Sequence, residues 1–452
     1  MSREEMLAKI PDYEAFFTVD ELNAALWQLA KDHPDTVEVF EAGKSRKGRP
    51  MLCAKVGSGS KNALFYGCPH PNEPIGAMMC HYLARALVED EAYRKELDFT
   101  FYIIPVSDVD GTVLNEGWFK GPFTIYNYAR NFFRPEGKDQ VEWTFPMEHK
   151  GYSFQNPLPE TRALMKLIDE TKPAFIYSLH NGGFGGAFWY ISKDFGQDVY
   201  KEMHLAAAKG GVPLDLGEPE VPFAEVFAPA VYRMFSAGDL YDYYEKFAPG
   251  NPADMMFGGE CSAAYAGPDS TILVTELPYF YDKRVDSQTP LNYPRKEAVL
   301  QKIDFTLAHA AQLGKFFEAM QPHYSADNPF PGLISMYLRM AGGELESQKA
   351  FIEQDERFNE PCKECEAFSN ILMTRFYQLL NWGLMVRSCE FELSKNHDPA
   401  IEKILEETEA ILKKEAEELE QALDYRVIPI RQLVGIQLSC GLSVLERLSK
   451  SI

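Results

Sequence analysis

The sequence of 452 residues lacks several features that mark secreted, membrane and nucleic-acid-binding proteins. Its opening MSREEMLAKIPDYEAFF carries charges and a proline where a signal peptide needs an unbroken apolar segment. No apolar run approaches the roughly 20 residues that a helix needs to cross a bilayer. Positive charge is scarce, because the formal net charge is -22, and nonspecific nucleic-acid binding requires a positive surface. We therefore expect a cytoplasmic protein that binds neither membranes nor nucleic acid.

Cysteine is also sparse, with eight residues spread along the whole chain. Without a secretory signal, these thiols argue against a disulfide framework. Hydrophobic residues make up 46% of the chain and charged residues 25%, which is typical of a globular protein. A prior of roughly 150 residues per domain would allow about three domains, but α/β enzymes often form longer single units. We expect two domains.

Four short runs of β-branched and aromatic residues have the composition of buried strands. Segments with helical periodicity, such as those at 75–87 and 160–170, separate them. This alternation predicts an α/β fold with a mostly parallel or mixed central sheet and helices on both faces. The four runs are ALFYG at 63–67, FTFYIIPV at 99–106, PAFIYSL at 173–179 and TILVTEL at 271–277.

The chain changes character around QPHYSADNPFPGL at 321–333, which is rich in proline and turn-forming residues. From 399 to 423, apolar residues recur at steps of three or four, with Glu and Lys on the opposite face of the predicted helix. Helices near 364–390 and 430–449 would complete a small bundle. We therefore predict an α/β domain at 1–330 and a C-terminal all-helical domain at 334–452. The C-terminal helices would cap a cleft, form a homo-oligomer or complete the core.

Polar side chains follow three of the predicted strands. His70 and Glu73 lie just after the first run, His180 follows the third and Glu276 ends the fourth. Because the carboxyl ends of parallel strands meet at one edge of a sheet, we expect these residues to lie together. Imidazole nitrogen and carboxylate oxygen are suitable zinc ligands, and a hydrolytic zinc site needs three of them. We predict one Zn²⁺ per chain, held by His70, Glu73 and His180, with Glu276 beside it to activate water.

The order of these elements resembles that of the carboxypeptidase A-type zinc metallopeptidase family. The similarity runs from about residue 18 to about residue 320. The resemblance implies that residues 1–330 form a zinc carboxypeptidase-like catalytic domain, that Glu276 is the general base and that the substrate is a peptide. Three further stretches match the family pattern, GKSRKGRPM at 43–51, IPVSDVDG at 104–111 and LPETRALMKLI at 158–168.

The segment NYARNFF at 127–133 is similar to the family's DxNRNF stretch. This similarity implies that Arg130 binds the terminal carboxylate of the peptide through paired hydrogen bonds. A surface salt bridge is the alternative role for this arginine. Ala129 replaces the asparagine that precedes the arginine in the family, so one hydrogen bond to the carboxylate would be missing. That loss leaves room for a related activity, the deacylation of N-acyl amino acids.

Three other family functions have less direct matches. Lys120 in GWFKG is the nearest candidate for the arginine that stabilises the oxyanion, and an exposed loop lysine is the alternative. Glu260 and Cys261 fall at or beside the pocket position that selects the terminal side chain. Cys261 would favour an uncharged residue, whereas an inward Glu260 would favour a basic one. Asp254 stands at the place of the family's mobile tyrosine, for which the nearby alternatives are Tyr241, Tyr243, Tyr244 and Tyr265.

The sequence thus predicts a zinc metallocarboxypeptidase that removes C-terminal amino acids from peptides. A zinc-dependent deacylase of N-acyl amino acids would use the same ligands and the same base. A catalytically silent peptide-binding protein, whose α/β domain only supports the helical bundle, is the alternative from another functional class.

Overall fold

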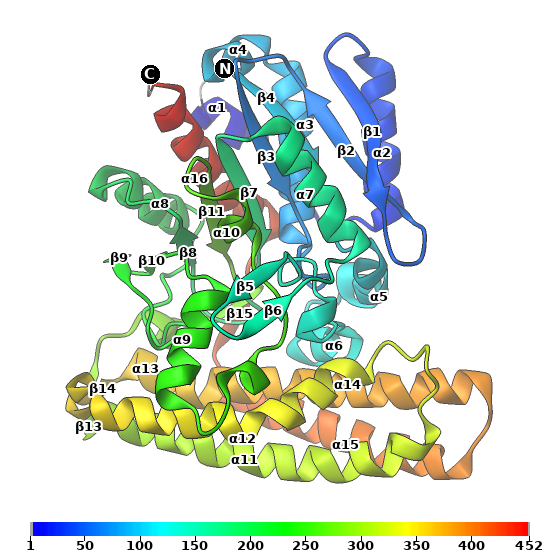
Figure 1. The fold of residues 1–452 in the computed structure, drawn as a ribbon, viewed down its shortest axis with the longest axis vertical. Coiled ribbons are helices and arrows are strands. Elements are labelled where there is room, and N and C mark those ends of the chain that lie inside the picture. The colour runs from blue at the N-terminus through cyan, green and yellow to red at the C-terminus, as the bar shows by residue number, and fades with distance from the viewer. Residues whose placement is uncertain (1–2, 451–452) are drawn as a thin grey trace.

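The computed structural model describes residues 3–450 and shows a nine-stranded mixed sheet above a layer of long helices (Figure 1). The strand order is β1-β2-β4-β3-β7-β11-β8-β10-β9. Helices cover both faces of this sheet, so the predicted α/β fold is confirmed. The strands are β1 (Val37–Lys44), β2 (Pro50–Val56), β3 (Lys61–Tyr66), β4 (Phe99–Ile104), β7 (Phe175–His180), β8 (Phe188–Ile191), β9 (Val226–Ala228), β10 (Val231–Arg233) and β11 (Thr271–Glu276).

The four strands predicted from apolar runs form the centre of the sheet. Strands β4, β3, β7 and β11 are neighbours in that order, and each pairs parallel with the next. The outer pairs β1–β2, β2–β4, β8–β11 and β9–β10 are antiparallel. Every residue of β7 and β11 is buried, which explains why these strands are continuous apolar runs rather than alternating ones.

Two hydrophobic cores lie on opposite faces of the sheet. On β7, Tyr177 packs into the core formed with α3 (Ile75–Glu89) and α16 (Ile430–Ser449). The adjacent Ile176 points the other way, into the core formed with α7 (Pro159–Thr171). Successive side chains of a strand point to opposite faces, so a strand buried on both sides must be apolar throughout.

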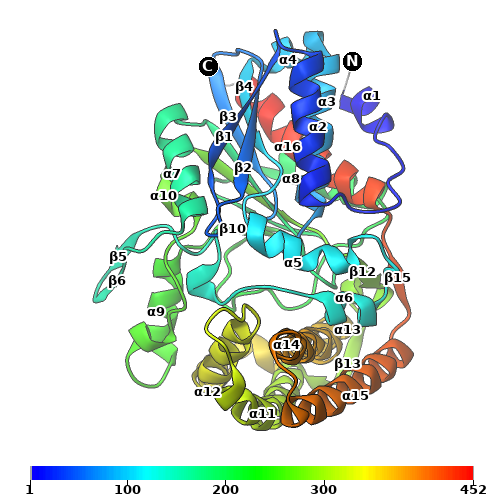
Figure 2. The same ribbon diagram turned by 90° about the vertical axis from the view of Figure 1, so that its right-hand side faces the viewer.

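Shorter elements complete the α/β part (Figure 2). Its other helices are α1 (Arg3–Ala8), α2 (Val19–Asp32), α4 (Glu91–Leu97), α5 (Val109–Phe119), α6 (Ile125–Asn131), α8 (Gln197–Lys209), α9 (Ala237–Phe247) and α10 (Ser262–Ala266). Three small sheets pair β5 (Met147–His149) with β6 (Tyr152–Phe154), β12 (Phe280–Asp282) with β15 (Tyr425–Val427), and β13 (Pro290–Pro294) with β14 (Pro361–Lys363).

Below the sheet lies a group of helices that we call the helical layer (Figures 1 and 2). Its central helix α14 packs against α15, α11 and α12. The layer meets the α/β part where α6 contacts α14 and α15, and where α9 contacts α12. Its members are α11 (Arg295–Met320), α12 (Pro331–Gln354), α13 (Glu364–Phe368), the π-helical turn η6 (Ser369–Met373), α14 (Thr374–Lys395) and α15 (Pro399–Ala422).

The prediction that the last helix, at 430–449, belongs to the helical bundle is wrong. The segment 430–449 forms a helix, α16, but this helix packs on α3, α8, β7 and β11 rather than in the bundle. Its Gly441 lies so close to the sheet that an added Cβ would come within 2.5 Å of Tyr177 Cε1. The helical layer also includes α11, which begins at Arg295. The division into residues 1–330 and 334–452 stays a prediction.

Two expectations about the chain as a whole can be compared with the structure. The eight cysteines are all buried and unpaired, as expected for a chain without a disulfide framework. Among residues 3–450, no helix combines the length and the apolar character that crossing a membrane would require.

Candidate metal centre

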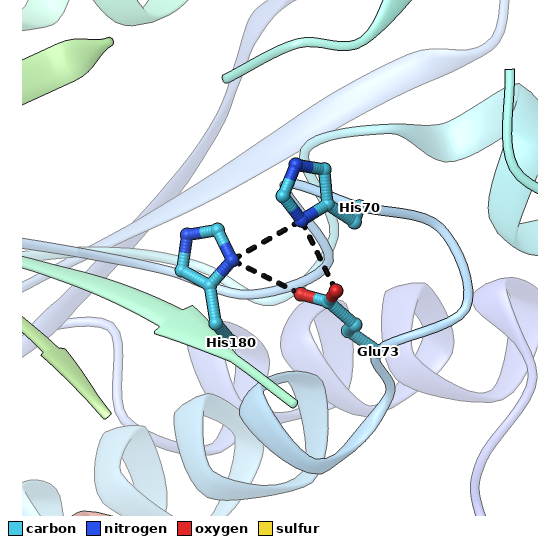
Figure 3. Close-up of side chains that lie close together, drawn as sticks. All are labelled: His70, Glu73 and His180. Carbon is cyan, nitrogen blue, oxygen red and sulfur yellow. Dashed lines mark hydrogen bonds and ion pairs between the residues drawn. The ribbon is translucent and has the colours of Figure 1, made fainter. Parts of the chain in front are cut away.

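The turn after β3 and the end of β7 bring two imidazoles and one carboxylate together (Figure 3). His70 Nδ1 lies 3.0 Å from Glu73 Oε1, and His180 Nδ1 lies 3.1 Å from Glu73 Oε2. The two Nδ1 atoms are 3.2 Å apart. All three side chains are buried. They are the residues that the sequence predicted to share a metal ion.

These separations fit a zinc ion. Two ligand atoms that each lie about 2.0–2.1 Å from a tetrahedral zinc are about 3.3 Å apart. The observed spacings of 3.0–3.2 Å are close to that value. His70 and His180 also direct nitrogen atoms at each other, an arrangement that a cation between them would stabilise. The donor types, their number and their spacing are therefore those of a zinc site.

The turn that carries the first two ligands is rigid. Glu73 donates its backbone N–H to the carbonyl of His70 at 3.1 Å. Between them, the Asn72 side chain donates to the Tyr128 hydroxyl at 3.2 Å, and the Asn72 carbonyl accepts from the Tyr279 hydroxyl at 2.8 Å. These bonds hold the turn through its middle residue and so keep the spacing of His70 and Glu73.

The three side chains divide their protons unequally. Burial, and after it the positive charge of Arg134, lower the pKa of His70 to about 3, so this imidazole is neutral. Burial also opposes a charge on His180, but the bonded Glu73 and then Glu276 raise its pKa to about 9. Burial would raise the pKa of Glu73, yet the two imidazoles more than offset it and hold that pKa low. The raised pKa favours the charged form of His180 in the metal-free site, so a metal ion that binds its Nδ1 would have to displace a proton.

A buried carboxylate outside the ligand set orients His180. The carboxylate is that of Glu142, which acts through Ser178. His180 Nε2 lies 2.8 Å from Ser178 Oγ, and Ser178 in turn donates to Glu142 at 3.3 Å. Glu142 also accepts from the Tyr66 hydroxyl at 2.8 Å and from the Ser262 backbone N–H at 3.0 Å. Such contacts fix the ring of a metal-binding histidine. Sequence reasoning missed Glu142, because it stands in a segment without a motif or a regular element.

Glu276 stands beside the ligands. It ends β11 and is paired in register with His180 at the end of β7. Its Oε1 lies 3.7 Å from His180 Nδ1. Burial, and after it the charge of Glu73, raise the pKa of Glu276 well above its ordinary value. The predicted approach of His180 and Glu276 is therefore what the strand register produces.

A cavity of about 720 Å³ opens in front of these residues. His70, Glu73, His180 and Glu276 line one side of it, together with Cys261. Residues of α11, α12, η6 and α14 line the other side. A volume of this size is typical of pockets that bind small molecules.

The structure places Arg130 elsewhere, which corrects its predicted position. Arg130 lies inside α6 and points to the helical layer, where its Nε donates to Glu409 at 2.8 Å. Its Nη1 donates to Glu390 at 3.2 Å, and Nη2 is also bonded to Glu390. The side chain is engaged by two carboxylates outside the cavity lining, so the salt-bridge alternative describes it.

Arg134 brings a guanidinium to the cavity instead. Its Nη1 lies 3.4 Å from Glu73 Oε1, and its Nε donates to Gln140 at 3.2 Å. Helix α6 ends at Asn131, so Arg134 lies in the following segment. Pro135 could have indicated that Arg134 lies outside a helix, because the residue before a proline favours an extended conformation.

The other predicted contact residues lie in different surroundings. Lys120 pairs with Glu21 at 2.6 Å and is exposed, as the alternative of a surface lysine describes. Glu260 Oε1 accepts the backbone N–H groups of Ala237 at 2.8 Å and Cys261 at 3.0 Å, so this carboxylate is held by backbone. Cys261 itself lines the cavity. Of the two residues considered for the specificity pocket, the structure brings only Cys261 to the lining.

Among the four tyrosines considered as replacements for the mobile tyrosine, Tyr244 lines the cavity. Tyr265 instead donates to Asp169 at 2.7 Å. The cavity also contains tyrosines that the sequence did not single out, among them Tyr190, Tyr337 and Tyr377.

Comparison with known proteins agrees with this geometry. Residues 22–207 match the model of the zinc carboxypeptidase family, peptidase family M14. Carboxypeptidase A6 of Homo sapiens is 29% identical over 174 residues, which are 35% of this chain and 39% of the human protein. Carboxypeptidase A6 of Mus musculus is 33% identical over 175 residues, 35% of this chain and 40% of the mouse protein. The chain thus spans about two fifths of the length of these relatives.

A solved structure with a similar arrangement is that of carboxypeptidase A from Helicoverpa armigera. It has 17% sequence identity and a TM-score of 0.37, over 61% of this chain and 70% of that protein.

Proposed function

We propose that this chain is a zinc-dependent carboxypeptidase that removes C-terminal amino acids from peptides, because residues 22–207 match the model of the zinc carboxypeptidase family. The observation that carries the proposal is the convergence of His70, Glu73, His180 and Glu276 at one cavity. His70, Glu73 and His180 would hold one zinc ion. When bound, zinc supplies a Lewis acid that polarises a carbonyl and lowers the pKa of water.

Glu276 has the position and the basicity of a general base. Its raised pKa favours the acceptance of a proton at a carboxylate oxygen during attack on the scissile carbonyl. The same oxygen can then pass that proton to the leaving amine nitrogen. His180 lies 3.7 Å away, so the proton acceptor stands directly beside the metal ligands.

Arg134 is the group that we assign to the negative charge of the substrate. A guanidinium has five N–H donors, and those of Arg134 engaged so far are directed at Gln140 and Glu73. Its paired donors match the two oxygens of a terminal carboxylate. We also propose that Cys261 lines the pocket for the terminal side chain and that this pocket favours an uncharged residue.

A second candidate function is the hydrolysis of N-acyl amino acids. The same zinc ligands and Glu276 would cleave the amide, and Arg134 would bind the free carboxylate of either substrate. The apolar side chains Met336, Met340 and Met373 on the far side of the cavity would accept an acyl chain. This observation keeps the deacylase as the alternative.

The cytoplasmic location and self-association through the C-terminal helices are further parts of the proposal.

One experiment tests the proposed reaction. Protein of known zinc content is incubated with a mixed peptide library and with a set of N-acyl amino acids, and products are identified by mass spectrometry. Release of single C-terminal amino acids by the wild type, but not by Glu276→Gln, supports the carboxypeptidase. Turnover of N-acyl amino acids alone would favour the deacylase. Zinc-loaded protein that cleaves neither set would leave only a peptide-binding role.

A further inference from the structure

The helical layer forms the wall of the cavity that faces the metal centre. In both views it lies along one side of the α/β part (Figures 1 and 2). Side chains from three of its elements reach the same cavity as His70, His180 and Glu276. Among them are Met336, Tyr337 and Met340 of α12, Asn370 and Met373 of η6, and Tyr377 of α14.

Three glycines show how closely the helical layer packs against the α/β part. A Cβ added to Gly183, in the loop after His180, would come within 2.5 Å of Phe376 Cε1 on α14. A Cβ at Gly383 of α14 would overlap the carbonyl of Ala129. A Cβ added to Gly217 would likewise overlap the Ser369 side chain of η6. Three segments around the cavity thus contact the helical layer without room for a single methyl group, as in a packed interior.

Polar contacts also join the helical layer to the α/β part. Arg387 of α14 is partly buried, and burial lowers its pKa to about 10. Its guanidinium donates to the carbonyls of Asn131 at 2.7 Å, Phe132 at 3.0 Å and Leu114 at 2.8 Å. Removing this donor would leave those backbone carbonyls without these hydrogen bonds. Together with the pairing of Arg130 to Glu390 and Glu409, these bonds make the helical layer a fixed wall rather than a hinged cover.

The chemistry of the wall differs from that of the metal centre. Opposite the imidazoles and carboxylates stand thioethers and aromatic rings, such as those of Met340, Met373 and Tyr377, together with charged and polar side chains such as Lys302 and Glu344. Methionine side chains adapt to apolar groups of different shape, and tyrosine offers a ring with a polar tip. The wall therefore offers apolar contacts to a bound peptide beside charged and polar groups.

We infer that the helical layer restricts this site to short peptides. The inference rests on the proposed carboxypeptidase function. A cavity of about 720 Å³ encloses a ligand of small-molecule size, which for a peptide means only a few residues. With the terminal residue beside Cys261 and Arg134, the preceding residues lie against α12 and α14. A longer chain meets the fixed wall.

The test is a series of peptides that share the same last two residues and extend as dipeptide, tetrapeptide and decapeptide. Their binding to the zinc-loaded Glu276→Gln variant is measured by calorimetry, and their hydrolysis by the wild type is followed in parallel. We expect the decapeptide to bind at least about tenfold more weakly than the tetrapeptide. Equal binding of all three lengths would overturn the inference, whether or not the wild type cleaves them.

Variants of the wall sharpen the result. Met340→Ala and Tyr337→Ala remove volume from α12 inside the cavity and should reduce the length penalty by several-fold, with zinc content unchanged. Leu307→Ala on α11 is the matched control, because Leu307 is 47% exposed and outside the cavity lining. It should leave the length profile as in the wild type. Thermal unfolding of each variant verifies that it is folded.

The outcomes separate this inference from the proposed function. A length penalty in binding without hydrolysis of any peptide would support the wall and overturn the carboxypeptidase. Hydrolysis of all lengths at equal rates would support the carboxypeptidase and overturn the wall. Failure of every peptide to bind would overturn both.

Discussion

Glu276 differs from the three metal ligands in what its removal should do. The Glu276→Gln variant keeps the size of the side chain and leaves His70, Glu73 and His180 in place. It should retain its zinc but lose turnover by about 10²–10⁴-fold, the usual contribution of a general base. Metal analysis and kcat for the same sample check both statements. A variant with wild-type kcat would show that another group accepts the proton.

Zinc uptake should depend on pH through His180. Its pKa is raised to about 9, so below that pH the metal-free site carries a proton that zinc must displace. His70 is already neutral because its pKa is lowered to about 3. Apparent zinc affinity should therefore rise about tenfold per pH unit as the pH approaches 9 and then level off. Competition titrations with a chelator of known affinity measure the slope, and a pH-independent affinity would contradict it.

The two arginines near α6 should have opposite importance for substrate. Arg134→Lys replaces a fork of donors by a point charge in the cavity and should raise KM by about ten- to a hundredfold, as expected for charged hydrogen bonds. Arg130→Lys changes a contact with Glu390 and Glu409 outside the cavity lining and should leave KM within about twofold, in line with partly exposed ion pairs. Steady-state kinetics on one peptide compare them. A larger KM effect at Arg130 would reverse our assignment.

The same two residues show where sequence reasoning reached its limit at this scale. His70, His180 and Glu276 could be predicted because each follows a strand whose apolar run is unmistakable. Arg130 was chosen from its resemblance to a family segment, and Arg134, four residues further on, was not considered. Pro135 indicated that Arg134 lies outside a helix, but no local pattern encodes the packing of α6 against α14 and α15 that turns Arg130 away from the cavity.

Among the elements, α16 makes a contact with the sheet that two glycines can test. A methyl group at Gly441 would clash with Tyr177, so Gly441→Ala should lower the free energy of unfolding by about 1–3 kcal/mol. At Gly435 of the same helix, the added Cβ would lie 3.6 Å from Ile10 Cδ1, an ordinary contact. Gly435→Ala should therefore be neutral or stabilise by up to about 1 kcal/mol, because alanine favours helix. Urea unfolding of both variants measures the difference, and equal effects would contradict this packing.

The positions of helices and strands along the chain were easier to predict than the elements that they pack against. The four central strands could be located from their apolar runs, and the segments that form α3, α7, α15 and α16 from helical patterns. The apolar face of 399–423 also identified side chains that are buried in α15, such as Leu412 and Leu419. An apolar face states that a helix is covered but not what covers it. For this reason α16 was expected in the bundle, although it packs on the sheet.

At the scale of the whole molecule, the cavity is assembled from parts that are distant in the sequence. His70 comes from the first third of the chain, Glu276 from the middle, and Tyr377 from the helical layer. The α/β part would place the metal ligands and the base, whereas the helical layer supplies the opposite wall. Composition and motifs indicated both parts, but their docking depends on contacts such as Gly183 with Phe376 and Arg387 with backbone carbonyls.

The central claim is that His70, Glu73 and His180 hold a single zinc ion beside Glu276. Crystals of the zinc-loaded protein, measured by anomalous X-ray diffraction on both sides of the zinc absorption edge, test it most directly. We predict one zinc peak per chain, bonded to Nδ1 of His70, Nδ1 of His180 and the carboxylate of Glu73. A zinc peak bonded to other residues, or none in this pocket at full loading, would contradict it.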